Sequence, residues 1–115
     1  MKWTPLLAAA VLGLAHGCTR APSPTKDQIR EDFDNLCQGQ KEYLEARRNL
    51  KGAPEKELRA ERTRRMREGL QTEAGLKAFE TLTGAPTADP RGDTERAAQG
   101  AGLTGWGCAE LAEYR

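Results

Sequence analysis

The sequence predicts an all-α fold, a small bundle of three to four helices stapled by one disulfide. Between positions 29 and 50, apolar residues recur at the three- and four-residue spacing that places them on one side of a helix. Gly, Pro and Thr residues then punctuate the chain at short intervals, and no stretch sustains the alternation of a strand. No internal repeat is visible, so we expect one domain over residues 26–115.

Residues 1–17, which precede this domain, are predicted to be a secretory signal. Lys2 gives the positive start, residues 6–15 form an apolar run, and Ala15 and Gly17 are the small residues of a cleavage site. The run is about half of the ~20 residues that a membrane-spanning helix needs. We therefore expect the segment to be removed rather than to stay as a span.

Ala15-His16-Gly17-Cys18 resembles a bacterial lipobox, in which a small residue precedes an invariant cysteine. The resemblance implies that Cys18 takes a diacylglycerol and that its new amino group is acylated, for example with palmitate. Because Thr19 rather than Asp follows the cysteine, the resemblance also implies the outer membrane. His16 stands where the pattern has a small residue, and the alternative is ordinary signal peptidase cleavage that gives a soluble secreted or periplasmic protein.

The cysteine count favours a lipid on Cys18. An odd thiol is unusual in an exported protein, and a lipid on Cys18 leaves Cys37 and Cys108 to pair. Cys37 is in phase with Phe33 and Leu44 on the apolar face of the first predicted helix. Since export leads to an oxidising compartment, we predict a Cys37–Cys108 disulfide.

The predicted helices follow from their start and stop signals. Residues 18–25 form the lipid-attachment cysteine and a Pro-rich tether, and Thr25 with Gln28 matches a capping box that begins the first helix. Gly52 and Pro54 end this helix. A second helix is expected near 54–70 and a third over 73–83, capped by Thr72, although one continuous helix remains an alternative.

The last third of the chain is rich in turn-forming residues. We expect a loop over 84–92, a short helix from Asp93 to Gln99, glycine turns over 100–107 and a final helical turn or two over 108–114. Trp106, beside Cys108, is expected to pack in the core. The stretches 76–79 and 105–111 look like the tails of some small helical lipoproteins of deltaproteobacteria, a likeness that implies no activity and no site.

The residue inventory excludes several chemistries. The one histidine, His16, lies in the predicted signal and the one serine, Ser23, in the tether, so Ser–His and Cys–His nucleophile pairs and the usual zinc ligands are excluded. Residues 18–115 carry 17 Lys or Arg and 17 Asp or Glu, and this balance predicts no binding to nucleic acid. No cofactor motif occurs. The carboxylate pairs Asp32/Asp34 and Glu110/Glu113 are interpreted as solvated helix surface.

The densest charge lies between Lys56 and Arg67, where six Lys or Arg face two Glu, a net of +4. One interpretation is a surface that contacts anionic lipid or an acidic partner through five arginines: Arg59, Arg62, Arg64, Arg65 and Arg67. The other, which the helical wheel favours, is a solvated helix. The tripeptide 91–93, Arg-Gly-Asp, is interpreted as a chance product of a turn.

Taken together, these patterns predict a cell-envelope protein held to the membrane by its N-terminal lipid. We expect a non-enzymatic binding or structural module whose partner is an envelope protein. A soluble secreted binder or inhibitor with the same fold is the alternative. An enzyme is the least expected, because residues 18–115 lack histidine.

Overall fold

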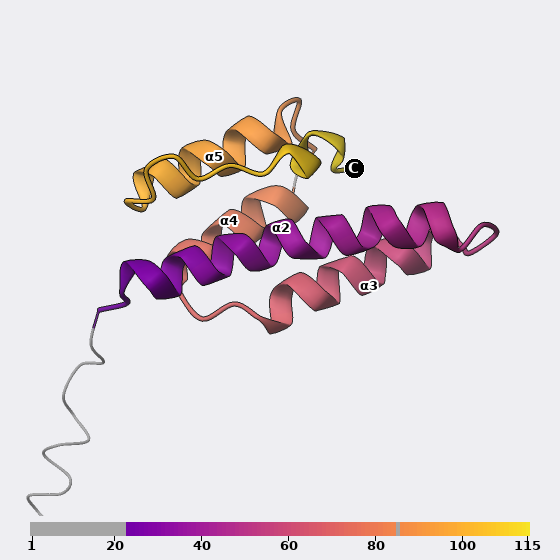
Figure 1. Cartoon of the computed structure of the whole chain (residues 1–115), viewed down its shortest axis with the longest axis horizontal. Coiled ribbons are helices and arrows are strands. Elements are labelled where there is room, and N and C mark those ends of the chain that lie inside the picture. Colours follow the sequence, from indigo (N-terminus) through magenta and orange to yellow (C-terminus); the bar gives the residue numbers. More distant parts are fainter. Residues whose placement is uncertain (1–22, 85) are drawn as a thin grey trace, which may run out of the picture.

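The computed structural model describes residues 23–84 and 86–115. Within these residues, every element of regular secondary structure is a helix. The elements are α2 (Lys26–Asn49), α3 (Glu55–Glu68), α4 (Glu73–Thr83), α5 (Pro90–Gly100) and a short 3-10 helix, η1 (Ala109–Glu113) (Figure 1). The predicted all-α bundle is confirmed. The predictions for the signal, for Cys18 and for most of the tether concern positions outside the described residues.

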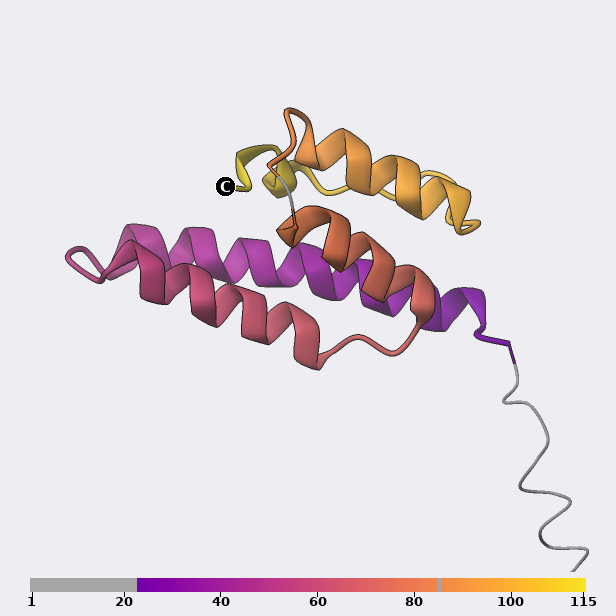
Figure 2. The ribbon, with the colours of Figure 1, turned by 180° about the vertical axis from the view of Figure 1, so that it is seen from behind.

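Helix α2 is the long axis of the molecule. It begins at the predicted capping box, in which the Gln28 backbone N–H donates to Thr25 Oγ1 at 3.1 Å and the Thr25 N–H donates to Gln28 Oε1 at 2.9 Å. Its 24 residues rise about 36 Å at 1.5 Å per residue. Helix α3 turns back beside the second half of α2, so the two form an antiparallel hairpin (Figures 1 and 2).

Residues 54–83 form two helices rather than one. Helix α3 ends at Glu68, and α4 begins after Thr72, whose hydroxyl accepts a hydrogen bond from the Gly75 N–H at 3.0 Å. After the break, α4 packs on the first half of α2, where Asp32 contacts Thr72 at the start of α4. The alternative of one continuous helix is therefore wrong.

Helix α5 begins three residues earlier than expected. Asp89 caps it by accepting a hydrogen bond from the Gly92 N–H at 2.9 Å, and Pro90 occupies the first turn, where its missing N–H costs no hydrogen bond. Residues 91–93 consequently lie in a helix and not in a loop, and Arg91 and Asp93 both form ion pairs within α5. Arg91 pairs with Glu95 at 3.0 Å, and Asp93 binds Arg96.

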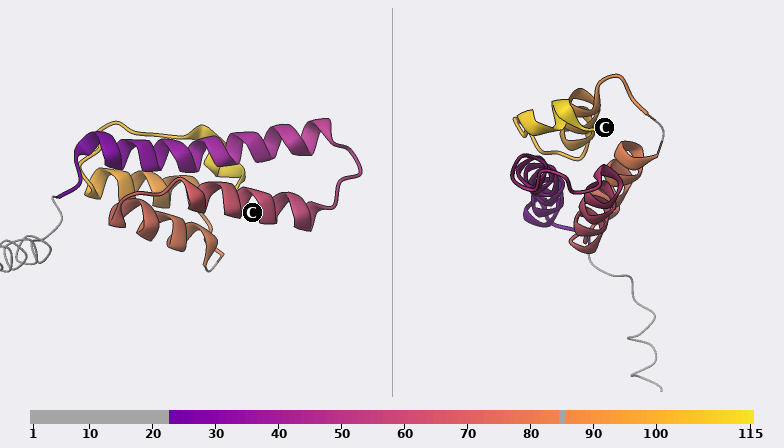
Figure 3. Two further views of the ribbon diagram at one scale, coloured as in Figure 1. Left: turned by 90° about the horizontal axis from the view of Figure 1, so that it is seen from below. Right: turned by 90° about the vertical axis from the view of Figure 1, so that its right-hand side faces the viewer.

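The core lies where α2, α3, α4 and the returning C-terminal segment meet (Figure 3). Its largest fully buried apolar side chains come from three separate parts of the chain: Phe33, Leu36, Met66, Leu103 and Leu111. The C-terminal segment reaches them through turns at Gly102 and Gly105, which both adopt positive φ, as the glycine pattern predicts. Among the described residues, no helix combines the length and the apolar character that crossing a bilayer requires.

Candidate functional site: a basic end and a buried arginine

Charge is separated along the length of the molecule. Residues 47–67 carry nine Lys or Arg and three Glu, a net of +6. The other described residues carry seven Lys or Arg and fourteen Asp or Glu, a net of −7. Residues 47–67, which we call the basic end, comprise the end of α2, the connecting loop and nearly all of α3. The basic end therefore lies over the half of the molecule farthest from Lys26, where α2 begins (Figure 1).

The five arginines that the sequence suggests as one surface do not lie on one surface in the structure. Three of them pair with carboxylates: Arg59 with Glu55, Arg64 with Glu61 and Glu68, and Arg65 with Glu42. These pairs are exposed, so they match the expectation of a solvated helix face. Arg67 is also exposed and forms no ion pair with a described residue. The fifth, Arg62, is in a different environment.

Arg62 is buried, with 4% of its surface exposed. Its Nη1 donates to Gln40 Oε1 at 3.0 Å and its Nη2 to the main-chain oxygen of Arg115 at 2.6 Å. The guanidinium also lies 4.2 Å from the ring centre of Tyr43 and 3.9 Å from that of Tyr114. The prediction that Arg62 belongs to a surface was wrong, since this side chain joins α2, α3 and the C-terminus.

Burial perturbs the ionisation of this cluster. It lowers the pKa of the Arg62 guanidinium and raises the pKa of the Tyr114 hydroxyl. No Asp or Glu side chain pairs with Arg62 among the described residues, and its Nε has no hydrogen-bond partner there. The hydrogen bonds to Gln40 and to the main-chain oxygen of Arg115, together with the two aromatic faces, therefore compensate the buried charge.

One signal in the sequence does mark Arg62. Leu58, Arg62 and Met66 follow one another at four-residue spacing, which places the arginine on the narrow apolar stripe of α3. The partner that covers it, Tyr114, is 52 positions away and has no local signature. Periodicity could thus have placed Arg62 on the buried face, but could not have identified what closes over it.

We expect Arg62→Gln to destabilise the fold by about 2 kcal/mol, because the substitution removes two aromatic contacts and two hydrogen bonds of a buried group. Arg64→Gln, on the exposed face of the same helix, is the matched control and should leave the urea midpoint nearly unchanged. Urea unfolding followed by circular dichroism measures both. Equal midpoints for the two variants would contradict the assigned role of Arg62.

Cys37 and Cys108 are joined by a disulfide, with their Cα atoms 5.9 Å apart, as predicted. Glu110 Oε1 lies 3.6 Å from Cys108 Sγ and 3.9 Å from Cys37 Sγ. A disulfide sulfur carries no hydrogen, so these contacts are not hydrogen bonds. The two sulfurs and the carboxylate resemble a metal-ligand set in spacing, but bonded sulfurs are not the thiolates that metals require. Glu110 is thus half-buried beside the disulfide, whereas Glu113 is exposed, as expected of solvated helix surface.

The two residues of the other carboxylate pair, Asp32 and Asp34, lie in different environments. Asp32 is fully buried, and it accepts hydrogen bonds from the Gln71 N–H at 2.9 Å, from the Thr72 N–H at 2.7 Å and from the Thr72 hydroxyl at 2.6 Å. The interpretation of Asp32 as solvated surface was wrong. Asp34 is exposed and accepts from Trp106 Nε1 at 2.8 Å.

Trp106 lies partly in the core, as expected from its place beside Cys108. Its ring meets Phe33 edge to face, with 5.4 Å between ring centres. Because its indole N–H binds the exposed Asp34, one edge of the ring stays at the surface. Trp106 therefore packs against the core at Phe33 rather than presenting a free aromatic surface.

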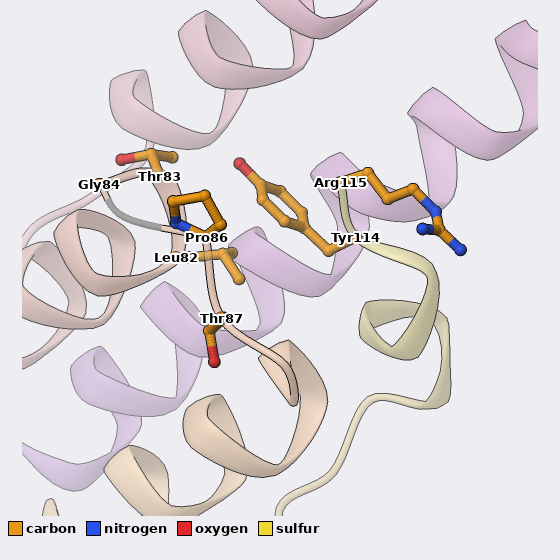
Figure 4. A pocket seen from close by; sticks show the side chains of 7 residues that line it. All are labelled: Leu82, Thr83, Gly84, Pro86, Thr87, Tyr114 and Arg115. Carbon is orange, nitrogen blue, oxygen red and sulfur yellow. The ribbon is translucent and has the colours of Figure 1, made fainter.

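A groove of about 470 Å³ lies where the end of α4 and the α4–α5 loop face the C-terminus. Figure 4 shows Tyr114 directed across it toward Thr83 and Pro86. The residues that line it are Leu82, Thr83, Gly84, Pro86, Thr87, Tyr114 and Arg115. No Asp or Glu side chain is among them, so both carboxylate pairs named in the sequence analysis lie outside this groove.

Comparison of this chain with protein-family models, with curated proteins and with solved structures gives no match.

Proposed function

We propose that this chain is a lipid-anchored protein of the cell envelope that acts as a non-enzymatic binding or structural module. The observation that carries the proposal is the position of Cys18, after a signal-like segment and seven residues before the capping box at Thr25. Seven extended residues reach at most about 25 Å. A lipid on Cys18 would thus hold the helical body close to the membrane surface.

A binding or structural role is supported by what the polar side chains do. Asp32 caps α4, and Arg62 ties three segments together. These two buried polar groups therefore serve the stability of the fold.

The Cys18→Ser variant is expected to lose the membrane anchor. The protein should move from the membrane fraction to the soluble fraction, or accumulate as uncut precursor, because serine offers no thiol for the diacylglycerol. Thr19→Ser, which leaves Gly17 and Cys18 intact, is the matched control and should remain membrane-bound. Fractionation followed by immunoblotting measures the distribution. A Cys18→Ser protein that is processed normally and still sediments with membranes would show that the anchor lies elsewhere.

Mass spectrometry of the N-terminus separates the two export routes. A diacylglycerol thioether on Cys18 is expected for the lipoprotein, with the extra mass of an acyl chain on the amino group. A free cysteine there would instead support a soluble secreted or periplasmic protein with the same fold. A lipid on Cys18 would limit the distance between the helical body and the membrane, whereas a free Cys18 would set no such limit.

A further inference from the structure

The loop between α2 and α3 presents an exposed apolar side chain among cations. Leu50 is 57% exposed. Arg48 and Lys51 lie within two positions of it in the sequence, and Lys56 is the second residue of α3, on the other side of the loop in the chain. We call these four residues the hairpin tip. All three cations are exposed and form no ion pair with a described residue, in contrast to Arg47 and Arg59, which share Glu55.

The backbone holds Leu50 outward in a defined turn. Its N–H donates to the Ala46 carbonyl at 2.8 Å, and its own carbonyl accepts from the Ala53 N–H at 3.0 Å. Gly52 closes the turn with φ of +93°, a conformation that other residues rarely adopt. The exposure of Leu50 is therefore built into the hairpin, and it is not the result of an unstructured loop.

We propose that the hairpin tip binds an anionic lipid surface, with Leu50 entering the headgroup region and the three cations pairing with lipid phosphates. Cations around an apolar side chain match the two layers of a membrane interface, since the cations stay at the headgroups while the apolar group goes deeper. An acidic polymer in solution would use the cations alone and would leave Leu50 in water. The combination favours lipid over a soluble polyanion.

The charge separation and the length of α2 fit a second membrane contact. Repulsion at an anionic surface acts on the −7 remainder of the molecule, and attraction acts on the +6 basic end, so the field turns the hairpin tip toward the lipid. The tether allows α2 to lie along the surface, with the tip about 36 Å from the first residue of α2. A contact that is weak in isolation becomes intramolecular once the chain is anchored. That last step rests on the proposed lipid at Cys18, but the affinity of the tip does not.

The test uses residues 18–115 with Cys18→Ser and the disulfide intact, so it does not depend on lipidation. We expect co-sedimentation with vesicles that contain 30% phosphatidylglycerol, and none with pure phosphatidylcholine vesicles. Each cation near an anionic surface contributes about a fivefold gain in partition, so Arg48→Glu/Lys51→Glu should weaken binding at least about 25-fold. Thermal melts confirm that each variant is folded.

Arg30→Glu/Lys77→Glu is the matched control. It changes the net charge by the same amount at two exposed residues of α2 and α4 that form no described ion pair. Arg30 is about 27 Å along α2 from Arg48, well beyond the screening length at 0.15 M salt, so binding should change less than about threefold. An equal loss in both double variants, or equal binding to both vesicle types, would overturn the proposal.

Leu50→Ser separates lipid from other anions. We expect it to weaken binding to the phosphatidylglycerol vesicles and to leave binding to soluble polyglutamate unchanged. If Leu50→Ser binds the vesicles as well as the unmodified tip does, the surface recognises negative charge alone and the assignment to lipid is wrong. A failure here leaves the anchoring experiment on Cys18 unaffected, because that experiment measures the attached lipid and not the tip.

Discussion

Replacing Cys37 and Cys108 together with alanine is expected to lower the free energy of unfolding by about 4 kcal/mol. The bond joins residues 71 positions apart, and the chain-entropy model assigns about that value to a loop of this length. Small domains have a total margin of ~5–15 kcal/mol, so the variant loses a large fraction of its stability. The melting temperature should fall by roughly 15 °C or more.

The effect should be concentrated in the C-terminal segment. Residues 101–115 bury only Leu103, Cys108 and Leu111. Apart from the disulfide, they attach to α2 through hydrogen bonds from Gln40 Nε2 to the Glu110 carbonyl at 3.1 Å and from Trp106 Nε1 to Asp34 at 2.8 Å, and through the contact of Trp106 with Phe33. Without the disulfide, this segment should open before the α2–α3 hairpin does. Hydrogen exchange should therefore accelerate first in residues 101–115 and in α5, on which η1 packs.

Reduction gives an independent measurement of the same bond. A reductant should shift the urea midpoint of the unmodified protein toward that of the double alanine variant and leave the variant itself unaffected. Thiol labelling of the unfolded protein without reductant should modify neither Cys37 nor Cys108. Two reactive thiols at these positions, or identical midpoints with and without reductant, would contradict the assigned contribution of the disulfide.

Local signals in the sequence were enough to predict the helices and the disulfide. The Thr25–Gln28 box begins α2 because capping depends on residues three positions apart, and Thr72 begins α4 for the same reason. Cys37 and Cys108 were paired by counting and by the apolar phase of Cys37. The start of α5 was placed too late, because the loop-like composition of residues 84–92 outweighed the helix-start signal of Asp89 and Pro90.

The buried polar residues were missed because their partners are distant in sequence. Asp32 is three residues after Ile29 and four before Leu36, and Arg62 lies midway between Leu58 and Met66, so each stands on an apolar face. Charged residues are nevertheless usually exposed, so sequence reasoning predicts a surface position for both. Both groups are buried because distant parts of the chain cover them. Residues 71–72 cover Asp32, and Tyr114 covers Arg62.

Asp32→Ala is expected to cost about 3–5 kcal/mol, the other large effect in this fold. The side chain is fully buried and accepts from three donors of Gln71 and Thr72. Hydrogen bonds to a charged acceptor are each worth about 1.5–3 kcal/mol, and alanine leaves the buried Thr72 N–H without its acceptor. The negative charge also sits at the positive N-terminal end of α4.

Asp32 acts through a relay at the start of α4. The Thr72 hydroxyl donates to Asp32 Oδ2 and accepts from the Gly75 N–H, so the carboxylate orients the residue that caps the helix. Gly75 has no side chain, and a Cβ there would collide with the Asp32 carboxylate. Thr72→Ala removes the relay and should cost less than Asp32→Ala. The double variant should cost less than the sum of the two single variants, because both remove the same hydrogen bond.

Asp34→Ala is the matched control for this prediction. It removes a carboxylate two positions away on the same helix, one that is exposed and accepts only from the Trp106 indole among the described residues. We expect a small shift of its urea midpoint and a large one for Asp32→Ala, with α4 losing protection from hydrogen exchange only in the latter. Similar midpoints for the two variants would show that water replaces the donors of Asp32 without cost. In that case the connection between α3 and α4 would depend mainly on the apolar core that includes Met66, Phe79 and Leu82.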